Sequence, residues 1–284
     1  MKNYLSLIKF SHTIFAMPFA IIGFFLAQST SGASFDLKKF ILMLACMVFA
    51  RSAAMAFNRY LDRDIDAKNP RTKMREIPAG IVSAKSALTF TILNSVFFIA
   101  ATWFINPICF FLSPLALLVV LGYSYTKRFT ALCHLVLGLG LSLAPIGAYL
   151  VVTGEFALLP VLFSLAVLTW VSGFDIIYAL QDEDFDRSEH LHSIPQWLGK
   201  KNALSFSSFL HLFSAAFIIG AGIHGSFSWF YWLGATGYCA MLVYQHSLVK
   251  PNDLSKVNIA FMTANGIASV VFAAFFLADT FFRI

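Results

Sequence analysis

Three side chains that carry an amide or a carboxylate recur at every fourth position in one stretch of the chain: Asn58, Asp62 and Asp66. Residues four apart lie on the same face of an α-helix, so these groups are predicted to form a stripe over two turns. Arg51 and Met55 continue that face into the apolar residues that come before it. The stretch therefore predicts a helix whose end presents several oxygen atoms together.

A second acidic stretch has the same character. Its spacing of three, four and four residues again places four side chains on one helical face: Asp175, Tyr178, Asp182 and Asp186. Most of the acidic residues of the chain lie within 58–80 and 175–201. Two helix ends are thus predicted to present one acidic stripe each, and their similarity hints at a duplicated unit of two helices and a loop.

Like charges on one face repel each other, and three arrangements would compensate for this repulsion. Salt bridges to basic neighbours would make the first stretch a merely solvated segment; the candidates are Arg59, Arg63, Lys73 and Arg75. Divalent cations are the second arrangement, because Mg²⁺ takes oxygen ligands and is usually held by one or two carboxylates together with substrate phosphates. An ion pathway is the third, since acidic residues within a membrane often mark one.

Basic residues favour the second arrangement. Several of them are predicted on the same side as both stripes: Lys73, Arg75, Lys127, Arg128, Lys200 and Lys201. Carboxylates and cations around one site suit a diphosphate bridged by Mg²⁺, whose remaining oxygens need positive partners. A cation channel would not need these basic residues.

The stripes must be positioned by an unusually apolar chain. Of its 284 residues, 59% are hydrophobic and 12% are charged, whereas a soluble domain carries roughly 25% charged residues. Apolar runs of the length of a transmembrane helix predict about nine spans, at about 10–28, 40–60, 87–105, 108–126, 130–152, 156–178, 203–223, 227–248 and 257–281. These runs are continuous, so the expected fold class is an all-α membrane protein and not a barrel.

The distribution of basic residues predicts the orientation of these spans. With the N-terminus in the cytoplasm, every Lys and Arg falls on the cytoplasmic side except Lys38, Lys39, Arg283 and the intramembrane Arg51. Cytoplasmic loops of membrane proteins carry such an excess of positive charge. We therefore expect one polytopic domain, residues 1–284, in a bacterial inner membrane, with cytoplasmic acidic loops and membrane lipid around it. The positive charge is clustered at helix ends, so no nucleic-acid partner is expected.

Three motifs follow one another along the chain. The first is Asn58-x-x-x-Asp62-x-x-x-Asp66, which continues through Asn69-Pro70-Arg71-Thr72, Arg75 and Pro78-x-Gly80. The second is the short Tyr123-x-x-x-Lys127, and the third is Asp175-x-x-Tyr178-Ala179-x-x-Asp182-x-x-x-Asp186. In this order and separation they resemble the motifs of the UbiA-type intramembrane prenyltransferases. The resemblance covers essentially the whole chain.

This resemblance implies an enzyme that transfers a polyprenyl chain from polyprenyl diphosphate to an aromatic acceptor that carries a carboxylate or a hydroxyl. Mg²⁺ would be held by Asn58, Asp62, Asp66, Asp182 and Asp186. The leaving diphosphate would be neutralised by Arg71, Lys73, Arg75 and Lys127. The allylic carbocation would form in a central cavity capped by the cytoplasmic loops, where its candidate partners are Tyr123 and Tyr178.

Two further stretches, HTIFAMPFA and RSAAMAFNR, resemble the bacterial 4-hydroxybenzoate polyprenyltransferase branch of that family. That branch is also linked to menaquinone made by the futalosine route. The expected acceptor is therefore 4-hydroxybenzoate or a naphthoate, in ubiquinone or menaquinone synthesis. Glu183 and Asp184 depart from the pattern of the third motif, and we expect them to be solvated loop charges.

Arg51 is the most informative basic residue, because a cation inside an apolar span needs a partner. It lies seven residues before Asn58 and therefore on the same face, which points it into the predicted site. We hypothesise that its planar guanidinium binds the carboxylate or hydroxyl of the acceptor; a structural pair with a buried acid such as Asp175 is the alternative. Asp175, at the inner end of its stripe, is expected to orient or deprotonate the acceptor.

Two other functions share some of these features. A CDP-alcohol phosphotransferase also uses aspartates and a divalent metal in a membrane, but it needs an Asp-Gly-x-x-Ala-Arg element that the first motif lacks. A cation transporter would place ionisable residues in the middle of several spans, and only Arg51 and Asp175 fit that description. The sequence therefore favours prenyl transfer over both.

Overall fold

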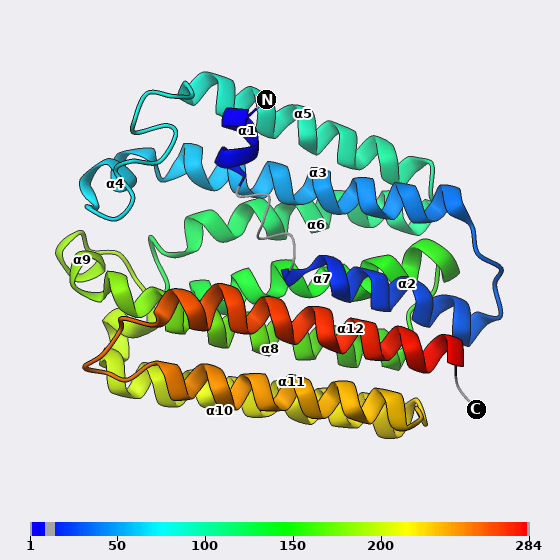
Figure 1. Cartoon of the computed structure of the whole chain (residues 1–284). Coiled ribbons are helices and arrows are strands. Elements are labelled where there is room, and N and C mark those ends of the chain that lie inside the picture. The colour runs from blue at the N-terminus through cyan, green and yellow to red at the C-terminus, as the bar shows by residue number, and fades with distance from the viewer. Residues whose placement is uncertain (1, 9–14, 283–284) are drawn as a thin grey trace.

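Figure 1 shows the computed structural model of the chain, which describes residues 2–8 and 15–282. Within these residues the secondary structure is helical, apart from a bridge between Lys250 and Asp253, which confirms the all-α fold. The α-helices are α1 (Lys2–Leu7), α2 (Met17–Ser31), α3 (Leu37–Leu61), α4 (Arg63–Lys68), α5 (Ala84–Trp103), α6 (Pro107–Thr126), α7 (Cys133–Thr153), α8 (Leu158–Ala179), α9 (Glu183–Ser188), α10 (Ile194–His224), α11 (Trp229–Leu248) and α12 (Asn265–Phe282). A 3₁₀ turn follows α8 at Leu180–Asp182, and a π-helical segment at Ile259–Ala264 leads into α12.

Local chemistry sets several of the helix boundaries. The Asn106 side chain accepts a hydrogen bond from the backbone N–H of Cys109 at 2.9 Å, and Pro107 occupies the first turn of α6. Gly154 ends α7 with a φ of +68°, a left-handed conformation that favours glycine because it has no Cβ. Both boundaries coincide with breaks that the sequence predicts.

Seven helices in the described residues are long and apolar enough to cross a membrane: Leu37–Leu61, Ala84–Trp103, Pro107–Thr126, Cys133–Thr153, Leu158–Ser188, Ile194–His224 and Ile259–Phe282. The helix α2 is apolar but shorter, and residues 10–14 of the span predicted there lie outside the described residues. The helix α11 is not among the seven, because aromatic residues, Gln245 and His246 lower its hydropathy. These helices make the chain an integral membrane protein.

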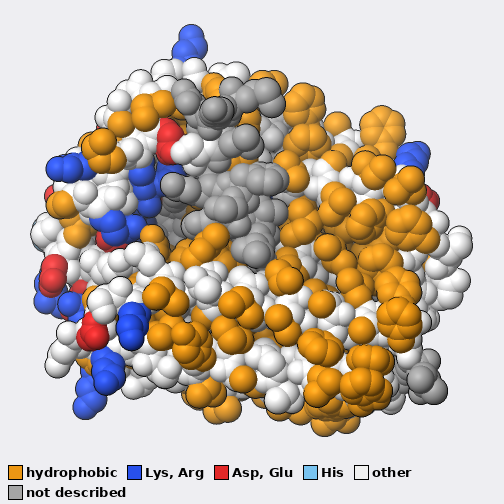
Figure 2. Space-filling view, in the orientation of Figure 1, with side chains coloured by type: hydrophobic (Ala, Val, Ile, Leu, Met, Phe, Trp, Pro, Cys, Tyr) orange, Lys and Arg blue, Asp and Glu red, His pale blue; other side chains and the backbone are white. Residues whose placement is uncertain are grey.

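The long helices run side by side (Figure 1), and a cavity among them is lined mainly by α3, α6, α7 and α8. The helix α8 packs against α7 and α10, α3 packs against α5 and α6, and α12 packs against α2 and α11. Large apolar side chains cover much of the face that Figure 2 shows. Phe111, Leu118 and Val243 are among the exposed apolar residues of the molecule. Such an extended exposed apolar surface is typical of contact with a membrane.

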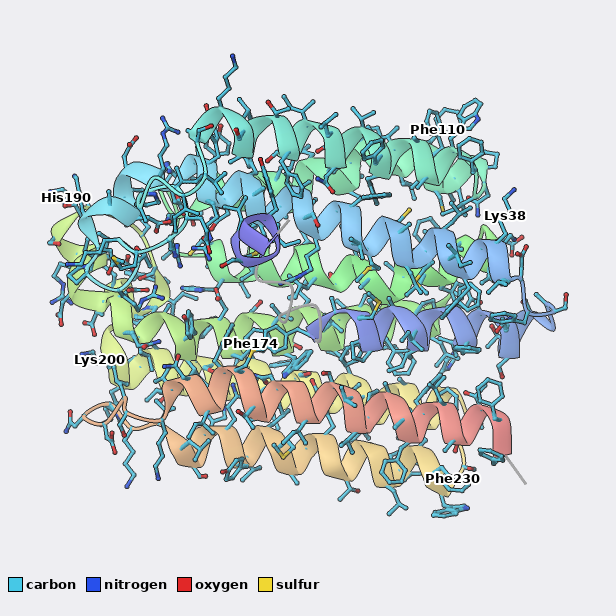
Figure 3. The ribbon with its side chains drawn as sticks, turned by 45° about the horizontal axis from the view of Figure 1, so that its top comes forward. Lys38, Phe110, Phe174, His190, Lys200 and Phe230 are labelled. Atoms are coloured by element: carbon cyan, nitrogen blue, oxygen red, sulfur yellow. The ribbon has the colours of Figure 1, made fainter. Side chains whose placement is uncertain are left out.

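Charged side chains gather at the end of the bundle that carries α4 and α9 (Figure 2). His190 and Lys200 lie at this end, whereas Lys38 and Phe230 lie at the opposite one (Figure 3). Both acidic stretches fold in the same way, as a long helix followed by a helix of six residues. The bundle therefore has one polar end, at which the two stretches meet.

An aromatic core holds α8 in place beside the cavity. Trp170 is fully buried, and its indole N–H donates to Asn265 Oδ1 at 2.8 Å. The ring of Phe19 lies 5.5 Å from that of Trp170 and 6.0 Å from that of Phe272, so α2, α8 and α12 are joined through their rings. The same helix α8 carries Asp175, which this packing fixes relative to α2 and α12.

Gly138 allows α7 to approach α8 closely. A Cβ at this position would lie 2.4 Å from the backbone carbonyl oxygen of Leu168, so the two helices would have to move apart. We expect Gly138→Ala to destabilise the fold by roughly 1–3 kcal/mol, measured as a lower midpoint of thermal unfolding in detergent. Gly147→Ala in the same helix is the control, because a Cβ there meets nothing within 4 Å. Equal midpoints for the two variants would contradict this prediction.

Candidate active site

The first acidic stripe lies on one continuous helical path. The helix α3 ends at Leu61, but the backbone N–H of Asp62 donates to the carbonyl of Asn58 at 2.9 Å, and that of Asp66 to the carbonyl of Asp62 at 2.7 Å. The three side chains are therefore stacked at the end of α3 and along α4, in agreement with their spacing.

Asp62 is buried at the centre of a group of polar contacts, with 2% of its surface exposed. Its carboxylate forms salt bridges with Lys127 Nζ and, at 2.9 Å, with Arg128 Nη2. The side-chain amide of Asn58 donates to the same carboxylate at 3.1 Å. A buried carboxylate is tolerated when it is paired in this way. These contacts bring the tyrosine–lysine motif at the end of α6 against the first aspartate motif.

Asp66 is held by the loop that follows α4. Arg75 Nη1 donates to both carboxylate oxygens, at 2.7 and 2.9 Å, and the Thr72 hydroxyl donates to the backbone carbonyl of Asp66 at 3.1 Å. The contact between Arg75 and Asp66 is one of the salt bridges that the sequence predicts as an alternative to metal binding. Arg63 instead pairs with its exposed neighbour Asp64 at 3.7 Å.

Arg71 joins the two aspartate motifs. Its Nε donates to Asp182 Oδ1 at 3.0 Å, its Nη2 donates to the other oxygen of that carboxylate, and its Nη1 donates to the Tyr178 hydroxyl at 3.1 Å. Asn69 donates to Asp182 as well, at 3.1 Å. Burial opposes the charge on Arg71, but the hydrogen bond and charge of Asp182 outweigh it and raise the pKa of Arg71.

These residues surround a small polar cavity of about 230 Å³. Five carboxylates line it, those of Asp62, Asp66, Asp175, Asp182 and Asp186, together with three cations, Arg71, Arg75 and Lys127. Within residues 2–8 and 15–282, no three acidic, histidine or cysteine side chains converge into a closed metal site. The oxygen donors nevertheless suit Mg²⁺, because this ion is commonly held by one or two carboxylates and completed by water and phosphate.

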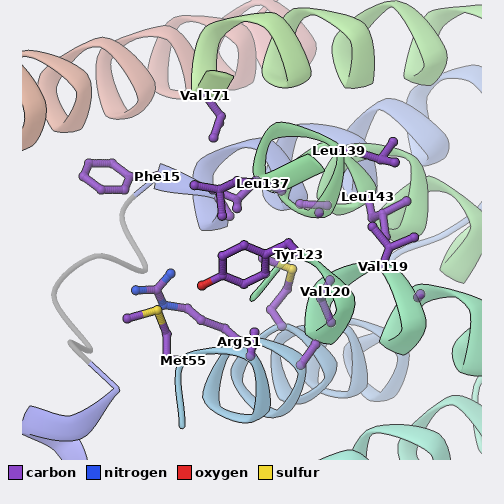
Figure 4. A pocket seen from close by; sticks show the side chains of 18 of the residues that line it. Phe15, Arg51, Met55, Val119, Val120, Tyr123, Leu137, Leu139, Leu143 and Val171 are labelled. Atoms are coloured by element: carbon purple, nitrogen blue, oxygen red, sulfur yellow. The ribbon is translucent and has the colours of Figure 1, made fainter. Parts of the chain in front are cut away.

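A larger cavity of about 1320 Å³ adjoins the polar one, and its walls are largely apolar. Arg51 and Tyr123 are polar residues in this wall, and Figure 4 shows the guanidinium of the first and the hydroxyl of the second in the same part of the pocket. Asn58, Asp175 and Tyr178 line both cavities. The two cavities together can therefore accommodate a molecule with a charged head and a long apolar tail.

Asp175 lies at the junction of the two cavities and has a partner on α7. His134 Nδ1 lies 2.7 Å from its carboxylate Oδ2. Asp175 is thus in contact with His134, a residue to which the sequence assigns no role.

The sequence model of one protein family matches residues 16–276, which include every one of these polar contacts. The chain belongs to the UbiA prenyltransferase family. Among solved structures, the apo structure of a UbiA homolog from Aeropyrum pernix K1 is 33% identical and has a TM-score of 0.86, covering 94% of this chain and 98% of that one. A UbiA homolog from Archaeoglobus fulgidus bound to GPP and Mg²⁺ is 20% identical and shares the fold, with a TM-score of 0.79 over 98% of this chain and 99% of that one.

A relative with a named activity is the 4-hydroxybenzoate octaprenyltransferase of Shewanella halifaxensis. It is 28% identical over 239 residues, which cover 84% of this chain and 83% of the relative. Membership of the UbiA family disfavours the two competing functions, the CDP-alcohol phosphotransferase and the cation transporter.

Most of the predicted site residues of this UbiA family member line one or both cavities: Arg51, Asn58, Asp62, Asp66, Arg71, Arg75, Tyr123, Lys127, Asp175, Tyr178, Asp182 and Asp186. Lys73 does not, because the turn at Asn69 leaves it exposed and outside both. Glu183 differs from the expected solvated charge: it is buried and pairs with Arg187 at 3.0 Å, whereas Asp184 is exposed as expected.

Three residues contact the aspartates although the sequence assigns them no individual role: Asn69, Arg128 and His134. His134 lies within a predicted span, so the argument that an intramembrane ionisable residue needs a partner applies to it as it does to Arg51. Arg128 directly follows Lys127, and both reach the carboxylate of Asp62 because α6 ends beside α3. That proximity comes from helix packing and leaves no local pattern in the sequence.

Proposed function

We propose that this protein transfers a polyprenyl chain from polyprenyl diphosphate to an aromatic quinone precursor, with release of diphosphate, in a reaction that requires Mg²⁺. One observation carries the proposal: a small cavity with two aspartate motifs and several cations adjoins a large apolar cavity. A polyprenyl diphosphate has the same two parts. The name of the Shewanella relative and the ligands of the Archaeoglobus homolog support the donor, the acceptor class and the metal.

The charges of the polar cavity explain why a metal is needed. The five carboxylates that line it outnumber its three cations, so a diphosphate would meet net repulsion unless positive charge entered with it. Mg²⁺ held by Asn58, Asp62, Asp66, Asp182 and Asp186 would neutralise the diphosphate oxygens and improve the leaving group. Arg71, Arg75 and Lys127 already lie at the cavity, and each can exchange part of its contact with a carboxylate for a contact with phosphate.

The apolar cavity supplies the setting for the reaction. Ionisation breaks the bond between the prenyl C1 atom and the diphosphate oxygen, and the electron pair leaves on the diphosphate. Tyr123 and Tyr178 line both cavities, where their rings can stabilise the allylic cation while the apolar walls exclude water. A ring carbon of the acceptor then bonds to C1 and loses its proton, for which Asp175 at the junction is the candidate base.

We also propose the membrane arrangement that the charge distribution favours. It consists of one domain, residues 1–284, with nine spans in the bacterial inner membrane: the seven apolar helices together with α2 and α11. The N-terminus and the loops around α4 and α9 would face the cytoplasm, where positively charged loops are favoured. Water-soluble diphosphate would then be released on that side, while the prenyl tail stays at membrane depth.

The function is tested with membranes that contain the full-length protein, Mg²⁺ and a long-chain polyprenyl diphosphate. 4-Hydroxybenzoate and a dihydroxynaphthoate are supplied separately, and prenylated product is detected by mass. We expect product with 4-hydroxybenzoate, the acceptor in the names of the relatives, and none after EDTA is added. Product with the naphthoate alone would instead assign the enzyme to menaquinone synthesis. Folded protein that yields neither product nor released diphosphate would contradict the proposal.

Arg51 is proposed to bind the carboxylate of the acceptor. Replacing it by alanine removes a charged hydrogen-bond donor from the apolar wall, so we expect the KM for the acceptor to rise roughly 10–100-fold. The KM for the polyprenyl diphosphate should change little, because Arg51 lines only the larger cavity. Met55→Ala, one turn away in the same wall, controls for lost volume. A normal acceptor KM in Arg51→Ala would refute this role.

A further inference from the structure

His134 lies where the acceptor side of the site meets the diphosphate side. It is 4% exposed, and it lines the polar cavity but not the apolar one. Its partner Asp175, 2.7 Å from Nδ1, lines both cavities. The pair therefore extends from the junction, where the acceptor is expected, into the cavity proposed to hold the diphosphate.

The second ring nitrogen of His134, Nε2, differs from the first in its hydrogen bonding. Nε2 is buried and makes no hydrogen bond within the part of the chain that the structure describes. The thiol of the adjacent Cys133 donates to the backbone carbonyls of Ala131 and His192 and also lies near the His134 ring. Buried polar atoms in native proteins are nearly always satisfied, and an exception at a cavity calls for a ligand that completes it.

The tautomer of the ring follows from its known partner. A carboxylate only accepts hydrogen bonds, so Asp175 keeps a hydrogen on Nδ1 and fixes the orientation of the ring. A diphosphate oxygen also only accepts, so contact with Nε2 requires the cationic ring with hydrogen on both nitrogens, which the negative charges of Asp175 and of the diphosphate stabilise. The Nε2–H donor of this ring, beside Lys127 and Arg71 in the same cavity, is suited to an anionic oxygen.

We propose that His134 is a further diphosphate-binding residue, whose Nε2 contacts a diphosphate oxygen while Nδ1 holds Asp175. This inference rests on the proposed function and goes beyond it, because it connects the two substrates through one side chain. A diphosphate bound at Nε2 fixes the ring, and the ring fixes the carboxylate that faces the acceptor. The contact also strengthens as the leaving oxygen gains charge, which favours ionisation.

Two substitutions separate this role from a purely structural one. In His134→Asn, the short amide can take the position of Nδ1 and hold Asp175, but it does not extend to the position of Nε2. In His134→Gln, the longer side chain can place its amide N–H near the position of Nε2. A residue that only supports Asp175 is better replaced by asparagine, whereas a residue that binds diphosphate is better replaced by glutamine.

The probe is inorganic diphosphate with Mg²⁺, measured by equilibrium binding to the full-length protein and as an inhibitor of the reaction. We expect His134→Asn to weaken diphosphate binding about tenfold and to raise the KM for polyprenyl diphosphate by a similar factor, with little change in the acceptor KM. His134→Gln should bring both the diphosphate affinity and the KM for polyprenyl diphosphate most of the way back to the wild-type values. Wild-type affinity in His134→Asn, or an equal loss in both variants with normal thermal unfolding, would overturn the proposal.

A spectroscopic measurement does not depend on whether these variants fold. In protein labelled with ¹⁵N-histidine, one Nε2 resonance should shift when Mg²⁺ and inorganic diphosphate are added. The shift should persist in His192→Gln, which removes the other histidine that lines the cavity; its disappearance there would overturn the proposal. Because acceptor is absent, a wild type that binds no diphosphate would contradict the proposed function itself, whereas binding without that shift would contradict only the role of His134.

Discussion

Replacing Asp62 by asparagine is expected to lower the rate of prenyl transfer about 10³-fold or more, the largest effect of any single substitution in the first stripe. Asparagine keeps the size of the side chain and an oxygen that can still accept from Asn58. It removes the negative charge that holds Lys127 and Arg128, and it removes a ligand proposed for Mg²⁺. The rate is measured as prenylated product at saturating concentrations of both substrates.

Asp64→Asn is the matched control for this substitution. Asp64 lies two residues away in the first turn of α4, but its side chain is 83% exposed and lies 3.7 Å from Arg63. The control should retain the wild-type rate and the same response to EDTA. If Asp62→Asn showed the wild-type rate at the same Mg²⁺ concentration and with normal thermal unfolding, Asp62 would not be a ligand of the proposed metal site.

The sequence predicts well the features of this protein that depend on local spacing. Asn58, Asp62 and Asp66 share one helical path because the α-helix repeats every 3.6 residues, wherever the helix is placed. The helix boundaries at Asn106 and Gly154 can also be predicted from local sequence, because a capping side chain or a left-handed conformation depends on one or two residues. The fold class follows directly from the length of the apolar runs.

The partners of the aspartates could not be predicted in the same way. Which cation reaches which carboxylate depends on how α6 and α7 pack against α3 and how α8 packs against α7, and this information is spread over many residues. Arg128 and His134 therefore lacked an assigned role, although both contact aspartates across the bundle. Lys73 shows the opposite case: its position in the motif suggests a phosphate ligand, but the turn after α4 directs it to the surface.

The contacts across the bundle pair several of the proposed metal ligands with cations. Asp62, Asp66 and Asp182 each form a salt bridge with a different basic side chain, so three of the five carboxylates that line the polar cavity are paired with a lysine or an arginine. With Mg²⁺ and diphosphate bound, both partners of such a pair would keep a partner, because the carboxylate would bind the metal and the cation would bind the phosphate. These pairs thereby keep both groups in position for the substrate.

Arg71 is the cation for which this exchange should matter most. Arg71→Gln removes the charge that contacts both Asp182 and Tyr178, so we expect kcat to fall about 10²–10³-fold together with a higher KM for polyprenyl diphosphate. Arg71→Lys should restore only a small part of the rate, because a lysine cannot donate to both carboxylate oxygens and the tyrosine with the same planar geometry. Rates and both KM values are measured with purified protein in detergent.

Arg63→Gln provides the comparison, because Arg63 lies near the same motif but pairs with the exposed Asp64 and lines neither cavity. Its kinetics should remain close to those of the wild type. If Arg71→Lys were as active as the wild type, a point charge would suffice and the bidentate contact with Asp182 would be incidental. If Arg71→Gln lost activity with an unchanged KM for the donor, Arg71 would act by holding Asp182 and the second motif in place, and the direct contact with diphosphate would be excluded.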